Sequence, residues 1–310
     1  MMQRWKWKNI LFIGLILLGV PGISLFRSKY SLGLSEYEIC SNRIVSDIRI
    51  VQLTDLHNST FGDNNADLIA LVQEQNPDLI LITGDQLNSG EENTSIATDS
   101  ISALCQIAPV YVSLGNHEVE YQQSYNTDIK ALYEQAGATV LEREYVDTEV
   151  NGQQLRIGGI YGYCLPARYL ETNEADPEEC AFLSEFQDTD RYTVLLTHMP
   201  VCWLINDGIN EWDIDCVFSG HVHGGEVILP FIGGMYAPDF GWFPGKLEGV
   251  YTSDDGTKNL VLSRGLGTTE VIPRFNNIPE IVVVDLMQKL KLNMIIIQAI
   301  DFCMNGYRHR

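Results

Sequence analysis

Short apolar runs alternate with amphipathic segments from about residue 47 onward. The apolar runs have the length and the Val, Ile and Leu content of buried β-strands. They cover residues 48–57, 78–85, 109–118, 192–200, 215–225, 259–265 and 280–286. Apolar positions three and four apart predict helices over residues 65–77, 100–107 and 127–137. This alternation predicts an α/β fold.

Turn residues and strand ends refine this prediction. Residues 146–160 alternate around Asn151-Gly152, a pair that favours a tight β-hairpin. Five of the other apolar runs end in Asp, Asn or His. Because ligands of α/β proteins bind beyond the carboxyl ends of the strands, we expect the functional site to lie there.

The first residues follow another pattern. An uncharged run, residues 9–26, comes after Arg4, Lys6 and Lys8 and is long enough to cross the ~30 Å hydrocarbon core of a bilayer. Since basic flanks stay in the cytoplasm, we expect one transmembrane helix in the cell membrane, with residues 1–8 inside and all that follows outside. A cleaved signal peptide is the alternative, although no Ala-x-Ala site follows the run.

The remaining organisation is simple. We expect a linker over residues 27–46, one domain over residues 47–286 and a tail over residues 287–310. The apolar stretch within the tail predicts a final strand or helix on the core, with a membrane-surface contact as the alternative.

Composition excludes one class of partner. The formal net charge is -21, and a nucleic-acid-binding face needs clustered basic residues. No sequence feature predicts a protein partner. The seven cysteines form no C-x-x-C pair, so we expect buried free thiols, with a Cys164–Cys180 disulfide as the alternative.

Histidine is rare, yet five of the six histidines lie at or just past the apolar runs. Carboxylates and one amide accompany them. The candidate ligands are Asp55, His57, Asp85, Asn116, His117, His198, His221 and His223. Mixed imidazole, carboxylate and amide ligation suits Mn²⁺, Zn²⁺ or iron, and the number of ligands is sufficient for two ions. Two divalent cations would also attract an anionic substrate to an acidic protein.

The motif set DLH, GD, GNHE, H and GHVH, with "SGHVHGGE" at residues 219–226, resembles the calcineurin-like metallophosphoesterase superfamily. Within it, the sequence is similar to the bacterial membrane-linked phosphodiesterase-like branch. The resemblance covers about residues 47–286. It implies a four-layer α/β/β/α sandwich of two mixed sheets, here preceded by the N-terminal transmembrane helix.

The resemblance also implies roles for these residues. Asp55, His57, Asp85 and His223 would hold one divalent metal ion, and Asp85, Asn116, His198 and His221 the other. We expect Mn²⁺, with Zn²⁺ or iron as alternatives. A hydroxide that bridges the metals would attack phosphorus, and His117 would be the general acid.

One position departs from the superfamily. Many relatives carry an acidic residue three positions after the bridging Asp, where this chain has Asn88. We expect the Asn88 amide to orient the catalytic His117. Because the amide has no negative charge, we expect a lower pKa of His117 and a preference for esters with good leaving groups or for diesters. The alternative is that Asn88 is only a turn residue.

Other candidates depend on single residues. Arg264 and Arg274 could contact phosphate or form ion pairs. Glu118 and Glu226 are candidate partners that orient histidines. The aromatic, Gly-rich and Pro-rich segment 229–245 predicts a substrate groove, a lipid contact or a self-packed loop.

Together these features predict a dimetal phosphoesterase, in particular a phosphodiesterase. Its substrate is a phosphate ester, and membrane-associated esters are among the candidates. Two alternatives remain. One is a pyrophosphate-cleaving hydrolase of a nucleotide-linked lipid, which requires a site facing the cytoplasm. The other is a catalytically inactive member that binds a ligand.

Overall fold

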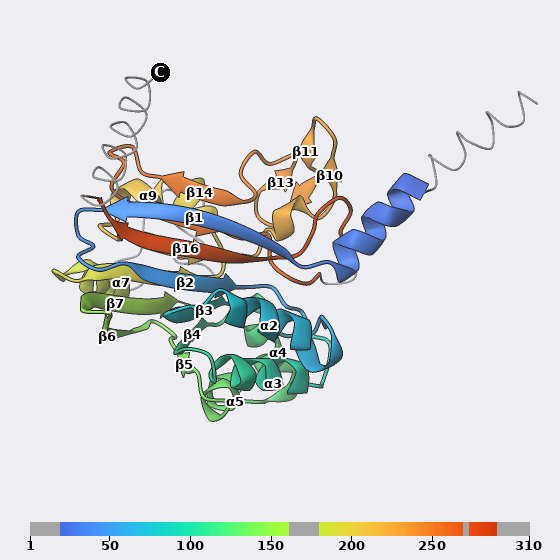
Figure 1. Ribbon diagram of the computed structural model, residues 1–310, viewed down its shortest axis with the longest axis horizontal. Helices are drawn as coiled ribbons and strands as arrows, with labels where there is room; N and C mark the ends of the chain where they lie inside the picture. The colour runs from blue at the N-terminus through green and yellow to red at the C-terminus, as the bar shows by residue number, and fades with distance from the viewer. Residues whose placement is uncertain (1–18, 161–179, 269–272, 290–310) are drawn as a thin grey trace, which may run out of the picture.

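Two six-stranded mixed sheets form the centre of the molecule (Figure 1). The computed structural model describes residues 19–160, 180–268 and 273–289. The α/β class and the two mixed sheets expected from the sequence are therefore confirmed.

The first sheet has the order β1-β16-β2-β3-β4-β5. All neighbouring strands are parallel except β16 and β2, which are antiparallel. The strands are β1 (Gly33–Ser41), β2 (Ile48–Leu53), β3 (Leu79–Thr83), β4 (Val110–Ser113), β5 (Thr139–Val140) and β16 (Glu280–Gln288).

The second sheet has the order β14-β15-β9-β8-β7-β6. Its inner four strands are parallel, and the strand at each edge is antiparallel to its neighbour. The strands are β6 (Glu144–Val150), β7 (Gln153–Ile160), β8 (Tyr192–Thr197), β9 (Cys216–Ser219), β14 (Gly249–Thr252) and β15 (Asn259–Leu262). The predicted hairpin is β6–β7, and its turn residues Asn151 and Gly152 have φ of 53° and 84°, as a two-residue primed turn requires.

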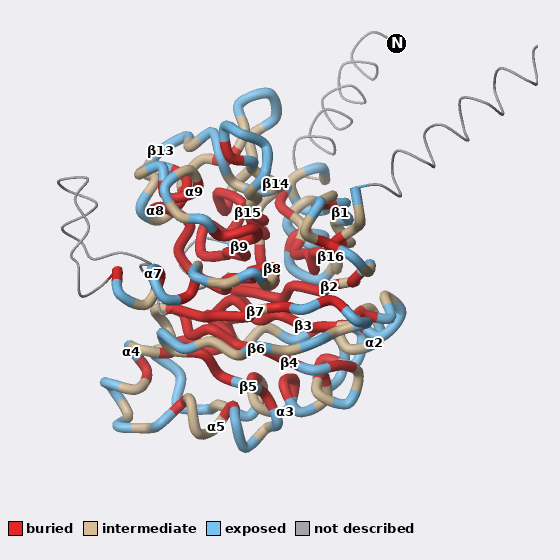
Figure 2. Tube along the Cα trace, turned by 90° about the vertical axis from the view of Figure 1, so that its left-hand side faces the viewer, coloured by how far each residue is buried: buried red, intermediate tan, exposed pale blue. Residues whose placement is uncertain are grey.

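Alternating side chains divide the interior into three layers of apolar contacts. Along β3, Leu79 and Leu81 face the second sheet, while Ile80 and Ile82 face the helices. The helices on the first sheet are α2 (Ala66–Glu74), α3 (Ser95–Leu104), α4 (Asn116–Tyr125) and α5 (Ile129–Gln135); those on the second are α7 (Ala181–Gln187), α8 (Val201–Leu204) and α9 (Gly208–Glu211). Buried strands fill the middle and exposed loops the outside (Figure 2), which is the α/β/β/α order of layers.

The predicted linker is corrected by the structure. Residues 33–41 form the edge strand β1, which pairs with β16 along its whole length. The sequence GLSEYEICS alternates side chains that are more and less exposed, as expected of a strand with one face on the core. Its many polar residues led to the prediction of a linker.

The N-terminal prediction falls largely outside the described residues. Residues 19–30 are helical, and most of the run 9–26 precedes them. Within the described residues, none of the helices combines the length and the apolar character needed to cross a bilayer. Residues 290–310 of the predicted tail, and Cys164 of the alternative disulfide, also lie outside the described residues.

The segment 229–245 contains two small hairpins rather than an irregular loop. They pair β10 (Ile228–Leu229) with β11 (Gly233–Gly234), and β12 (Tyr236–Ala237) with β13 (Gly241–Trp242).

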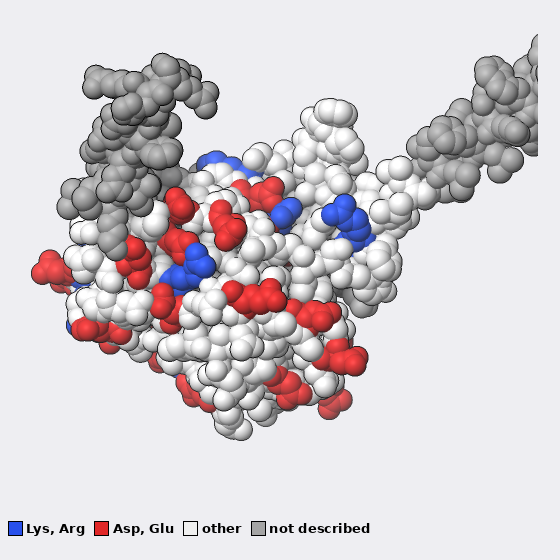
Figure 3. All heavy atoms as spheres, viewed as in Figure 1, with Lys and Arg blue, Asp and Glu red and all other residues white. Residues whose placement is uncertain are grey.

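Two short 3₁₀ helices complete the described structure. They are η1 (Asp63–Asn65) and η2 (His223–Gly225). On the face shown in Figure 3, acidic side chains predominate over basic ones, as expected from the net charge.

Candidate metal centre

Seven predicted ligands converge where the carboxyl ends of strands from both sheets face each other. Asp55 and His57 follow β2, Asp85 follows β3, and the first residue of α4 is Asn116. The second sheet contributes three histidines after β8 and β9: His198, His221 and His223. Six of the seven are buried. The predicted position of the site beyond the strand ends is confirmed.

The backbone at this site is unusual. Five of these residues have positive φ: Asp55 (54°), His57 (46°), Asp85 (54°), His221 (70°) and His223 (47°). Asp55 and His57 lie beyond β2, which ends at Leu53. Left-handed turns, not strand alternation, bring the two side chains together. Such conformations cost about 1–3 kcal/mol each and cluster at functional sites.

Two glycines allow the segments to approach each other. A Cβ atom on Gly220 would lie 2.4 Å from Asp55 Oδ2, and one on Gly115 would lie 2.2 Å from Asp85 Oδ1. No larger residue fits at either position without moving a carboxylate.

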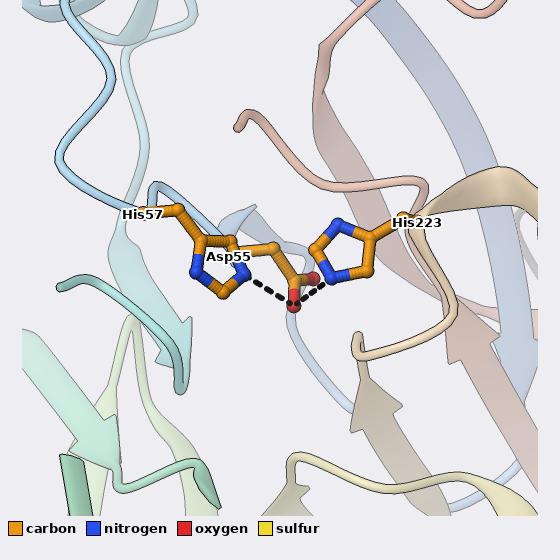
Figure 4. Close-up of side chains that lie close together, drawn as sticks. All are labelled: Asp55, His57 and His223. Atoms are coloured by element: carbon orange, nitrogen blue, oxygen red, sulfur yellow. Dashed lines mark ion pairs between the residues drawn. The ribbon is translucent and has the colours of Figure 1, made fainter. Parts of the chain in front are cut away.

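One carboxylate oxygen is surrounded by imidazole nitrogens. Asp55 Oδ1 lies 3.9 Å from His57 Nε2 and 3.8 Å from His223 Nε2 (Figure 4). These separations are too long for hydrogen bonds. Two atoms that each coordinate one ion at about 2.1 Å are roughly 3.0–4.2 Å apart, so the distances fit ligands of a shared cation.

A second carboxylate belongs to two ligand groups. Asp85 Oδ2 lies 3.7 Å from His57 Nε2 and 3.0 Å from His198 Nε2. Three triads have ligand atoms within 4.8 Å of one another: Asp55, His57 and His223; His57, Asp85 and His117; Asp85, His198 and His221. Asp85 is therefore placed to bridge two ions.

Two buried polar atoms at the site have no hydrogen-bond partner among the described residues. They are His57 Nε2 and Asn116 Oδ1. Such orphaned acceptors are costly unless something satisfies them. A cation does so, and the mixed donors suit a divalent metal. The residues present therefore fit a dinuclear centre.

Hydrogen bonds fix which nitrogen of each ring faces the centre. His57 Nδ1 donates to Asn88 Oδ1 at 3.0 Å, and the Asn88 amide nitrogen donates to the His57 carbonyl. The ring therefore presents an unprotonated Nε2 to the carboxylates. The prediction for Asn88 is corrected: it orients the candidate ligand His57, not His117, so the argument for a lower His117 pKa no longer holds.

Two more histidines are held in the same way. His198 Nδ1 donates to the Thr83 carbonyl at 2.7 Å, and His221 Nε2 pairs with Asp239 Oδ2 at 3.0 Å. Sequence reasoning missed both partners. A backbone carbonyl carries no sequence signal, and Asp239 comes from the segment 229–245, which had no assigned fold.

His117 differs from the other histidines because it is only half-buried. The backbone N–H of Ser89 donates to its Nδ1 at 3.1 Å, so the neutral ring carries its proton on Nε2. The ring lies 4.7 Å from that of His57, nearly perpendicular to it. This arrangement presents a proton donor beside the ligand cluster.

The pKa values of the buried groups suit metal binding. Burial lowers the pKa of His57 to about 3 and that of His223 well below its usual range, so both rings are neutral near pH 7. Burial would also lower the pKa of His198, but the carboxylates of Asp85 and Asp55 and the hydrogen bond to the Thr83 carbonyl together outweigh it and raise that pKa to about 10. In the metal-free protein a proton on His198 thus occupies the place of a cation, and metal binding must release it.

A family comparison agrees with this geometry. The model of the calcineurin-like phosphoesterase family matches residues 48–225, more than half of the 310-residue chain. The chain belongs to the calcineurin-like phosphoesterase family. It is thus a metal-dependent phosphoester hydrolase, and the predicted superfamily is confirmed.

The chain is also similar to individual phosphoesterases. It is 26% identical over 274 residues to the uncharacterised metallophosphoesterase YkuE of Bacillus subtilis, covering 86% of this chain and 89% of that protein. It is 28% identical over 246 residues to the phosphodiesterase YaeI of Escherichia coli, covering 77% and 82%. A 5'-nucleotidase precursor of Thermus thermophilus aligns with 78% of this chain and 55% of its own, at 15% identity and a TM-score of 0.45.

The two arginines of this phosphoesterase have structural roles. Arg264 pairs with Glu248 at 2.6 Å and with the buried Glu280, so the ion-pair alternative holds for it. Arg274 is buried and donates to the Gly267 carbonyl at 2.8 Å and to the Arg264 carbonyl at 2.6 Å.

The two glutamates differ from each other. Glu226 Oε1 lies 4.0 Å from His223 Nδ1, too far for a hydrogen bond, so Glu226 neighbours this histidine but does not orient it as predicted. The prediction for Glu118 is corrected, because its carboxylate accepts from the backbone N–H groups of Asp85, Gln86 and Gly115 instead of from a histidine. Glu118 therefore holds the turn that carries Asp85.

Proposed function

We propose that this protein is a two-metal phosphodiesterase whose general acid is His117. The observation that carries the proposal is the set of three ligand groups at the site. Two of them share Asp85, and one of these two includes His117, whose Nδ1 accepts the Ser89 N–H. The similarity to YaeI, which is named a phosphodiesterase, supports diesters over monoesters.

The ligands divide between two positions. Asp55, His57 and His223 would hold one ion, His198, His221 and Asn116 the other, and Asp85 both. Two bound divalent ions, which we propose to be Mn²⁺, supply positive charge to the phosphoryl oxygens and lower the pKa of water.

The protein supplies orientation and a proton. His117 would first take up a proton to form the imidazolium, and its Nε2–H would then donate to the oxygen that leaves phosphorus, which returns the ring to the neutral form. In the neutral ring, Nδ1 accepts the Ser89 N–H and Nε2 carries the remaining proton. The backbone N–H of His117 donates to Asp85 Oδ1 at 2.9 Å, which links the acid to the candidate bridging carboxylate.

We also propose that residues 9–26 anchor the protein in the cell membrane with the catalytic domain outside the cytoplasm. The uncharged run after Arg4, Lys6 and Lys8 supports this orientation. Attaching a reporter that works only outside the cytoplasm to residue 310 tests it, and an inactive reporter would contradict it.

Metal analysis and a pair of diesters test the function. The full chain, purified with Mn²⁺, should hold two ions and hydrolyse bis(p-nitrophenyl) phosphate. Asp85→Asn should lower the metal content, while the matched exposed variant Asp99→Asn should not.

His117→Ala should keep the metals and lose roughly 100-fold or more in kcat on diphenyl phosphate. The loss on the p-nitrophenyl ester should be smaller, because p-nitrophenolate leaves without a proton. A fully loaded wild-type protein with no turnover would instead identify an inactive binding member, and equal losses on both esters would exclude the acid role.

A further inference from the structure

A cavity of about 690 Å³ lies beside the candidate metal centre. His57 belongs to both, since it lines the cavity and is a candidate ligand. Arg274 also lines the cavity, and its Nη2 lies 3.4 Å from His223 Nδ1. A substrate at the metals therefore has this space next to it.

One wall of the cavity comes from the N-terminal helix, residues 19–30. Leu25, Ser28, Lys29 and Tyr30 line it. This helix precedes residues 48–225, the part that the family model matches. The wall is therefore a feature of this chain beyond the matched catalytic core.

Hydrogen bonds hold that helix against the catalytic domain. The backbone N–H of Asn276 donates to Ser24 Oγ at 2.9 Å, and that of Asn277 donates to the buried Ser28 Oγ at 3.0 Å. The Asn277 amide in turn donates to the His223 carbonyl at 2.7 Å. The helix is thus joined to a candidate metal ligand through one residue.

The lining combines apolar surface with a cation. Leu25 and Tyr30 are 42% and 59% exposed, and Leu266 and Pro273 add apolar surface from the domain. Large apolar side chains left this open at a cavity indicate an apolar ligand.

The charges along the cavity also point to an anion. Within the described residues, Lys29 forms no ion pair and makes only a contact with the Tyr30 ring, at 5.6 Å. The carboxylate of Glu91, which also lines the cavity, accepts hydrogen bonds from the amides of Asn58 and Asn88. Lys29 is thus a cation available to a ligand in a protein of net charge -21.

We infer that this cavity binds the hydrocarbon substituent of an amphiphilic phosphodiester, with the N-terminal helix as part of the substrate site. Leu25 and Tyr30 contact the chain, and Lys29 attracts the anionic substrate. This inference rests on the proposed phosphodiesterase function and names its substrate class.

Binding of two dialkyl phosphates tests the inference. Dimethyl phosphate and methyl octyl phosphate, below its micelle-forming concentration, are compared as inhibitors of bis(p-nitrophenyl) phosphate hydrolysis and by calorimetry on the Mn²⁺-loaded full chain. The octyl compound should bind about tenfold more tightly or better, because its added methylenes leave water. Equal affinities with intact hydrolysis would overturn the inference alone, whereas absent hydrolysis would overturn the proposed function.

Matched variants on the N-terminal helix test whether the octyl chain binds in this cavity. Leu25→Ser should reduce the affinity ratio of the two phosphates towards one, while Ile23→Ser, exposed and outside the cavity, should not. Lys29→Ala should weaken binding of methyl octyl phosphate severalfold, and Arg27→Ala should not. If the Ile23 and Leu25 variants changed the ratio equally, the chain would bind elsewhere.

Discussion

Single residues at the metal centre are held in place by partners that are not ligands themselves. Asn88, the Thr83 carbonyl and Asp239 each take the outward nitrogen of one histidine. Each bond places the proton of the neutral ring on the outward nitrogen, so the inward nitrogen can bind a metal, in His198 once its second proton has been released. The left-handed backbone at the ligands costs free energy that these bonds and the surrounding packing must offset.

Asn88→Ala tests whether the partner of a histidine contributes to metal binding. Because His57 would lose its only side-chain partner at Nδ1, metal affinity should fall about 10- to 100-fold. Titration of the metal-free protein with Mn²⁺ measures it, with Asn93→Ala, exposed in the same loop, as the control. An unchanged affinity would reduce Asn88 to a turn residue.

The first turn of α4 connects the ends of β3 and β4 through hydrogen bonds. Glu118 accepts the N–H of Gly115 in a capping box and also the N–H groups of Asp85 and Gln86 beyond β3. The hydroxyl of Tyr133 from α5 donates to it at 3.0 Å. One buried carboxylate thereby positions the ends of β3 and β4 and the first turn of α4.

Glu118→Gln should therefore destabilise the protein. A neutral amide accepts at only one atom and turns donors towards N–H groups, so the free energy of unfolding should fall by about 2–3 kcal/mol. Glu120→Gln, on the exposed side of the same helix, should change it by less than about 0.5 kcal/mol. Urea unfolding compares the two, and equal effects would refute this role of Glu118.

For the whole molecule, the buried histidines set how stability depends on pH without metal. The pKa of His57 is lowered to about 3 and that of His223 is also lowered, so their contribution is present above pH ~6.5 and lost as the pH falls below it. The pKa of His198 is raised to about 10. Its contribution is complete below pH ~6.5 and is lost as the pH rises towards 10.

The contribution of these three histidines should therefore be largest near pH ~6.5, with slopes of about 1.4 kcal/mol per histidine and pH unit on either side. Glu226, whose pKa burial raises to about 7, opposes one histidine on the acid side. Urea unfolding in a chelator at pH 5, 6.5 and 8 measures this. His57→Asn should remove one of the two histidine contributions to the acid-side slope. A free energy of unfolding that changes in one direction across this range would contradict the assignment.

The sequence by itself determined the α/β class, the central strands, the β6–β7 hairpin and which residues form the candidate metal centre. These features depend on local patterns: strand-length apolar runs, Asn151-Gly152 at a tight turn, and His and Asp side chains at strand ends. Local sequence specifies them because each depends on a few adjacent residues.

Only the tertiary structure decided how these residues are used. It placed β1 on the sheet edge, because the partner β16 lies more than 200 residues away along the chain. It assigned Asn88 to His57 and paired Asp239 with His221, since contacts between distant segments leave no local pattern. It also made the N-terminal helix a wall of the cavity beside the metal centre, a position that Ser28 and Asn277 fix by a hydrogen bond across 249 residues.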